Sequence, residues 1–212
     1  MYEKALLAGL RRIQDSIPAE DLAIQWDMVY EIGMLELPAA FTSWFNEPIM
    51  QGVLERVARV AEAVDKGVKM GVHLCYGDAE HKHFIEPKDM GVLVEMMNGI
   101  SSTVKRNVDW FHVPVPKDRT DEAYFLPLKN LNLNSETSIY LGLAHAWDLE
   151  GTRKRIDVTR RFLEDFGVAT ECGFGRTGRE EVENVLGVLA AVTDPEQETA
   201  IHNHDSLESA KL

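Results

Sequence analysis

The chain has 212 residues, of which 45% are hydrophobic, and its formal net charge at pH 7 is −13. This length suits one well-buried domain, and an acidic chain without a concentrated basic face is a poor candidate for binding nucleic acid or an anionic membrane. No segment approaches the run of about 18 apolar residues that a transmembrane helix needs, the N-terminus shows no signal peptide, and two cysteines give no disulfide framework, so a soluble cytoplasmic protein is expected.

Helical and strand patterns alternate along the chain. Amphipathic periodicity and proline positions predict helices over residues 2–17, 48–64, 87–104, 121–128, 151–165 and 179–192. Short apolar runs predict strands over residues 21–29, 70–76, 108–116, 138–147 and 166–175. The first strand is apolar enough to suit burial on both faces. The aromatic-rich residues 30–47 are irregular and suggest an active-site loop or, equally, a packed surface loop.

Regular strand–helix alternation predicts an α/β fold with a parallel sheet and right-handed crossovers. In such folds the functional residues gather at the carboxyl ends of the strands. The candidate functional residues at or near those ends are Asp27, His73, Cys75, His112, His145 and Cys172.

His73 and Cys75 are two residues apart, so on a strand both side chains leave the same face. Same-face neighbours lie roughly 6.5–7 Å apart at Cα, close enough to share one metal ion. Cys172, the other cysteine, stands at the end of a second strand-like run. The three side chains suggest a zinc site, although His73 and Cys75 by themselves would also suit a buried core pair.

Three segments occur in an order and spacing that resemble the catalytic domain of cobalamin-independent methionine synthase. They are Ile24-Gln25-Trp26-Asp27, His73-Leu74-Cys75-Tyr76 and Glu171-Cys172-Gly173-Phe174. The resemblance covers the chain to about residue 194, and the wider superfamily includes uroporphyrinogen decarboxylase and zinc-dependent coenzyme M alkyltransferases.

This resemblance implies a (β/α)8 TIM-type barrel, here partial and matching about the last five β/α units, over residues 1–194. Residues 195–212 would form a polar, flexible tail. By motif, His73, Cys75 and Cys172 would bind Zn²⁺, which would activate a homocysteine-like thiol toward a methyl donor, possibly a folate. Asp27 would be a substrate-site carboxylate.

Two departures from the family pattern stand out. The family has a glutamate zinc ligand on the next strand, roughly where this chain has Pro114, so the site would use three protein ligands or recruit His112 or Glu171. Three of the eight barrel strands and the family's folate-binding N-terminal half have no counterpart here. The chain could be a truncated product, or a homo-oligomer or a partner chain could complete the barrel.

Three functional hypotheses follow. The first is a zinc-dependent methyl- or alkyltransferase, with Asp27, His145 and Arg176 as substrate contacts, Arg176 holding a substrate carboxylate. His145 could equally make a structural hydrogen bond. The second is a catalytically inactive barrel fragment that binds a metal, a small molecule or a partner chain. The third is a metal-free lyase or decarboxylase with Asp27 and His112 as acid–base groups. The loop histidines His81 and His83 are predicted to be solvated.

Overall fold

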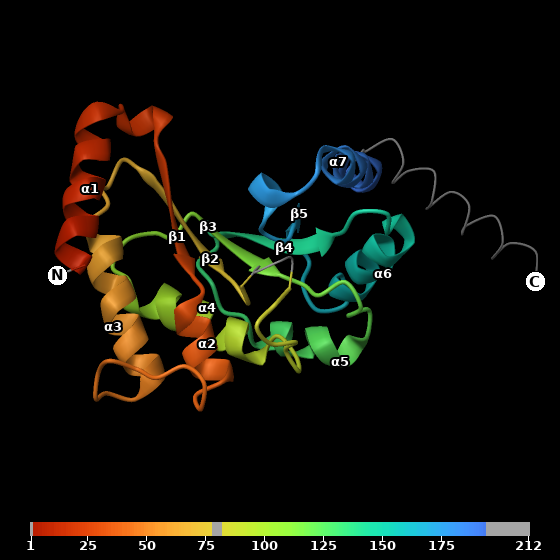
Figure 1. Ribbon diagram of the computed structural model, residues 1–212, viewed down its shortest axis with the longest axis horizontal. Coiled ribbons are helices and arrows are strands. Elements are labelled where there is room, and N and C mark those ends of the chain that lie inside the picture. The colour runs from red at the N-terminus through yellow and green to blue at the C-terminus, as the bar shows by residue number, and fades with distance from the viewer. Residues whose placement is uncertain (1, 78–81, 194–212) are drawn as a thin grey trace, which may run out of the picture.

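The computed structural model describes residues 2–77 and 82–193 (Figure 1). The strands are β1 (Ala23–Met28), β2 (Lys69–Leu74), β3 (Trp110–Pro114), β4 (Ser138–Ala144) and β5 (Gly167–Thr170). The α-helices are α1 (Tyr2–Ser16), α2 (Tyr30–Glu36), α3 (Ile49–Glu62), α4 (Gly91–Thr103), α5 (Glu122–Phe125), α6 (Leu149–Thr159) and α7 (Arg179–Thr193). Short 3-10 helices are η1 (Ala19–Asp21), η2 (Leu126–Asn130) and η3 (Phe174–Arg176). The predicted tail, residues 195–212, lies outside the described residues.

The strands form one parallel sheet in the order β1-β2-β3-β4-β5, as the alternation predicts. The register aligns Asp27 with His73, His73 with His112, and His112 with Tyr140, so one row of side chains crosses four strands on the same face. This α/β architecture is compatible with part of a (β/α)8 barrel. In the described sheet, β1 and β5 are the edge strands.

One face of the sheet is covered and the other is open. Helices α2, α3, α4, α5 and α6 lie on one side of the sheet in Figure 1, and the main hydrophobic core, which includes Val53, Val57 and Ala61 of α3, lies between these helices and the sheet. On the opposite face Ala23, Gln25, Asp27 and Tyr140 are exposed. The prediction that the first strand is buried on both faces is therefore wrong for the part of the chain described. No helix within that part is both long and apolar enough to cross a membrane.

Two boundaries differ from the sequence prediction for local reasons. Residues 30–36 form helix α2 where irregular structure is predicted, and its Ile32 and Met34 are fully buried, so tertiary packing stabilises this short helix. Helix α4 begins at Gly91 and not at residue 87; its N-cap is Met90, and in the turn before it the Asp89 carboxylate accepts a hydrogen bond from Gly91 N at 2.8 Å.

All five strands end earlier than predicted, and in three of them this change matters for the site. Strand β2 ends at Leu74, β4 at Ala144 and β5 at Thr170, so Cys75, His145 and Cys172 each follow a strand. Gly173, just before η3, has φ of 106°, a left-handed conformation that favours glycine. The three side chains therefore stand at the carboxyl edge of the sheet.

Gly71 provides a test of packing on the open face of the sheet. A Cβ atom at Gly71 would lie 1.9 Å from Trp110 Cε2, and Trp110 Nε1 donates to Gln25 Oε1 at 3.0 Å. We expect Gly71→Ala to lower the free energy of unfolding by about 1–3 kcal/mol, because the indole must move. The control is Gly187→Ala in α7, where a Cβ meets no atom within 4 Å and should stabilise by about 0.5–1 kcal/mol. Urea unfolding followed by circular dichroism measures the free energy of unfolding of both variants. Equal changes in the two variants would contradict the close packing of Trp110 on Gly71.

Candidate metal centre

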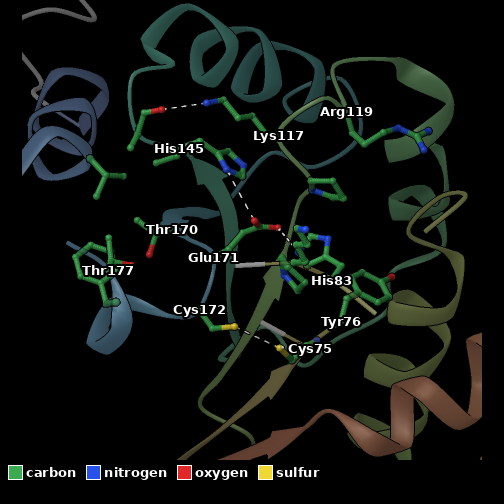
Figure 2. A pocket seen from close by; sticks show the side chains of 18 of the residues that line it. Cys75, Tyr76, His83, Lys117, Arg119, His145, Thr170, Glu171, Cys172 and Thr177 are labelled. Atoms are coloured by element: carbon green, nitrogen blue, oxygen red, sulfur yellow. Dashed lines mark hydrogen bonds and ion pairs between the residues drawn. The ribbon is translucent and has the colours of Figure 1, made fainter. Parts of the chain in front are cut away.

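His73, Cys75 and Cys172 converge at the carboxyl edge of the sheet. One ligand atom from each lies within 4.8 Å of the others, and Cys75 Sγ is 3.3 Å from Cys172 Sγ (Figure 2). In a flat sheet, β2 and β5 would lie about 14 Å apart, because three strand spacings separate them. The curvature of the sheet and the course of the chain beyond β5 therefore bring the cysteines together.

The hydrogen bonding of His73 leaves one ring nitrogen available. His73 Nδ1 lies 3.2 Å from the carbonyl oxygen of His112, which can only accept, so Nδ1 carries the hydrogen. The neutral ring then has its lone pair on Nε2, which is buried and has no hydrogen-bond partner among the described residues. A backbone carbonyl that fixes the tautomer in this way is typical of histidines that bind metals.

The close approach of the two thiols is better explained by a shared cation than by a contact between two neutral thiols. The pKa of Cys75 is raised, because the thiol contacts Cys172 and is buried, so the two sulfurs do not easily both become thiolates. A bound metal ion removes this conflict because coordinated thiols are deprotonated. Sulfurs about 2.3 Å from one tetrahedral zinc ion lie about 3.8 Å apart, close to the separation found here. The three side chains therefore fit a zinc ion.

His112 and Glu171, the two candidates for a fourth protein ligand, do not belong to this cluster in the described part of the chain. His112 Nε2 donates to the carbonyl oxygen of Thr170 at 2.8 Å, and its ring stacks on His73 with centroids 4.6 Å apart. Glu171 directs its carboxylate toward other histidines (Figure 2). A site with three protein donors keeps a coordination position open, which is the arrangement of catalytic zinc sites.

A cavity of about 650 Å³ opens beside the cluster. Cys75 and Cys172 both line it, together with side chains that follow β3 and β4. Pro114, at the position where the family glutamate is expected, is also in its wall. A small molecule in this cavity would therefore have access to both sulfurs.

Glu171 lies between two histidines in the same cavity. Its Oε1 is 3.1 Å from His83 Nε2 and its Oε2 is 3.8 Å from His145 Nδ1. Contact with Glu171 raises the pKa of His83, whereas burial lowers the pKa of His145. Although Oε1 is buried, no donor within the described residues is aligned to hydrogen-bond with it. The carboxylate therefore retains unused acceptor capacity.

The structure brings together some predicted site residues and separates others. His145 lines the cavity, and its Nε2 donates to the carbonyl oxygen of Val115 at 2.9 Å. Asp27 is exposed beside His73 in the register and accepts from Gln25 Nε2 at 3.0 Å. His112 lines a second, open hollow of about 600 Å³ on the uncovered sheet face. Arg176 is exposed in η3 and is not part of either wall.

His83 is the residue whose predicted environment is wrong. Its side chain is only 13% exposed and pairs with Glu171, whereas solvation is predicted; His81 lies outside the described residues. Tyr76, fully buried beside it, also lines the cavity and is not among the predicted site residues. The signal in the sequence for both residues is their position, because Tyr76 ends the predicted strand that carries His73 and Cys75, and His83 follows it closely.

The chain matches no protein-family model and no curated protein sequence. One similar solved structure is a protein from Listeria monocytogenes, provisionally assigned as a vitamin-B12 independent methionine synthase. It is 16% identical with a TM-score of 0.47, and the match covers 79% of this chain and 45% of that chain. Another is a B12-independent methionine synthase from Shewanella sp. W3-18-1 in complex with selenomethionine. It is 12% identical with a TM-score of 0.44, covering 92% of this chain and 67% of that chain.

This chain thus spans less than half the length of the Listeria protein.

Proposed function

We propose that this protein is a zinc-dependent methyl- or alkyltransferase that acts on a small-molecule thiol. The observation that carries the proposal is the convergence of one ligand atom each from His73, Cys75 and Cys172 within 4.8 Å, with both cysteines in the wall of a cavity. Zinc bound there would act as a Lewis acid that lowers the pKa of a substrate thiol. The substrate sulfur would then form a bond to the alkyl carbon, while the carrier leaves with the electron pair and takes up a proton.

The chain's own residues orient the substrate in this proposal. His145 Nε2 donates to Val115 O, so in the neutral ring Nδ1 is an acceptor. Glu171 Oε2 faces it across 3.8 Å, and two acceptors at this distance attract a donor between them. An ammonium nitrogen about 2.9 Å from each atom would fit this gap. A thiol that also carries an amino group, as a homocysteine-like substrate does, suits the cavity.

The remaining predicted contacts have separate roles in the proposal. Asp27, next to His73 in the register, is proposed as a further carboxylate for the substrate and Arg176 as a partner for a substrate carboxylate, although neither side chain lines the cavity. A folate or another carrier would supply the methyl group.

The proposal predicts both metal binding and thiol coordination in the purified chain. We expect about one zinc ion per chain by elemental analysis. In the cobalt(II)-substituted protein, added homocysteine should produce a new sulfur-to-metal charge-transfer absorption, because an open position accepts the thiolate. Mass spectrometry should then detect S-methyl product with methyltetrahydrofolate or another methyl donor. The surface variant Arg153→Ala, whose side chain pairs with Glu150 away from the cavity, is the control.

Each outcome of that experiment is informative. A protein without zinc after chelator-free, reducing purification contradicts the proposal. Zinc without thiol coordination indicates the non-catalytic alternative, a metal-binding barrel fragment. That alternative is favoured by the open sheet face on which Gln25, Asp27 and Tyr140 are exposed, a face that a second copy or a partner chain would cover by completing the barrel.

Glu171 should determine the preference for amino groups. We expect the zinc-loaded protein to bind aminothiols of two to four carbons at least about 10-fold more tightly than hydroxythiols of equal length, because a charged hydrogen bond contributes about 1.5–3 kcal/mol. Glu171→Gln should bring this ratio close to one in isothermal titration calorimetry. Glu181→Gln, which alters another carboxylate of the cavity wall, should keep the ratio. An unchanged ratio in Glu171→Gln at full zinc content would contradict this role.

A further inference from the structure

The two cysteines of the metal centre are also a pair in their own right. Their sulfurs lie 3.3 Å apart although 97 positions separate them in the chain. A disulfide bond has a length of about 2.05 Å, so an approach of roughly 1.2 Å would join them. The chain contains two cysteines in total, so no other thiol of the chain competes for either partner.

The surroundings of the pair allow an oxidant to reach it from one side. Cys172 is half-buried in the cavity wall, whereas Cys75 is 3% exposed. Cys75 also accepts a hydrogen bond from Gly77 N at 3.2 Å. A small oxidant in the cavity therefore meets Cys172 first, with Cys75 directly behind it.

We propose that Cys75 and Cys172 are an oxidative modification site, at which a hydroperoxide converts the two thiols to a disulfide that excludes the metal ion. This inference goes beyond the proposed transferase activity and does not require it. It depends only on the placement of the two sulfur atoms.

The chemistry balances with hydrogen peroxide as the oxidant. The sulfur of Cys172 attacks one peroxide oxygen, the O–O bond breaks, and water leaves with the Cys172 proton, which yields a sulfenic acid. The sulfur of Cys75 then attacks the sulfenic sulfur, the S–O bond breaks, and a second water leaves with the Cys75 proton. Both sulfurs are oxidised by one electron each, and the two peroxide oxygens are reduced. A disulfide lacks the thiolates that bind zinc, so oxidation and metal binding exclude each other.

The test uses the full chain, reduced, in metal-free and zinc-loaded forms, with hydrogen peroxide as the probe. In the metal-free form we expect alkylatable thiols to fall from two per chain to near zero. Peptide mass spectrometry should show Cys75 linked to Cys172, in a chain that stays monomeric on a non-reducing gel. Dithiothreitol should restore both thiols. In the zinc-loaded form, zinc should appear in a chromogenic chelator in step with disulfide formation.

Single variants identify the order of events. Cys75→Ser should accumulate a dimedone-reactive sulfenic acid at Cys172, and Cys172→Ser should react more slowly. Oxidised metal-free wild type should also melt at a higher temperature than the reduced metal-free form, because the cross-link closes a long loop. Oxidation to separate sulfinic acids, disulfide-linked dimers or persistence of both thiols would each overturn the inference. Disulfide formation in a protein that never binds zinc would contradict the proposed function and the exclusion of the metal ion, while it would support Cys75 and Cys172 as the site of oxidation.

Discussion

Cys172→Ser is expected to abolish zinc binding by the protein. The zinc content should fall from about one ion per chain to near zero on dialysis against a chelator, with affinity lowered by more than about 100-fold. Loss of a partner that merely orients a ligand already costs about 10–100-fold, and a serine hydroxyl does not ionise to replace the thiolate whose sulfur lies 3.3 Å from Cys75 Sγ. Elemental analysis and competition with a fluorescent zinc indicator measure the change.

Two further variants separate the possible ligand sets. His112→Gln keeps the backbone carbonyl that accepts from His73 Nδ1, and Glu171→Gln removes the carboxylate next to Cys172. If the site has three protein ligands, both variants should keep about one zinc ion per chain. Loss of zinc in either variant identifies that side chain as a fourth ligand, and full zinc content in Cys172→Ser would contradict the metal centre as described.

Arg155→Met is expected to lower the free energy of unfolding by about 3–5 kcal/mol, because it breaks a buried, hydrogen-bonded charge cluster. Arg155 is fully buried in α6. Its guanidinium donates to the carbonyl oxygens of Leu143 at 2.8 Å and of Lys117, and to Asp148 Oδ2 at 2.8 Å. Methionine fills similar space but leaves these acceptors without donors.

The matched control is Arg153→Met on the same helix. Arg153 makes an exposed ion pair with Glu150, and such pairs contribute less than about 1 kcal/mol. Urea unfolding at fixed protein concentration compares the two variants, and similar midpoints would contradict the role of Arg155. Arg155 joins the chain segments that follow β3 and β4, so a destabilised variant should also lose order around His145.

The parallel sheet and the strand-end position of the site could be read from the sequence. Alternating apolar runs predict the elements, and strand–helix alternation predicts that the strands are parallel with right-handed crossovers. The spacing of His73 and Cys75 is likewise local, since a strand places residues two apart on one face. The sequence pattern does not predict helix α2, because this helix is stabilised by the burial of Ile32 and Met34 and not by its own periodicity.

The partners of the site depend on contacts between distant segments. His83 lies in the cavity wall and pairs with Glu171, which is 88 positions away in the chain. The polarity of the sequence around His83 by itself indicates a solvated loop. The tautomers of His73 and His145 depend on the carbonyl oxygens of His112 and Val115, which no side-chain pattern reveals.

The sequence by itself determined the α/β architecture with its parallel sheet and the three side chains proposed to bind zinc, because these follow from local periodicity and residue chemistry. Only the tertiary structure decided that Cys75 and Cys172 lie 3.3 Å apart, that His73 Nε2 has no described hydrogen-bond partner, and that one face of the sheet is open. The physical reason is that sheet curvature and loop paths arise from the packing of many residues at once. The residue types of the candidate metal centre are thus set by the sequence locally, whereas their positions relative to one another are set by the tertiary fold.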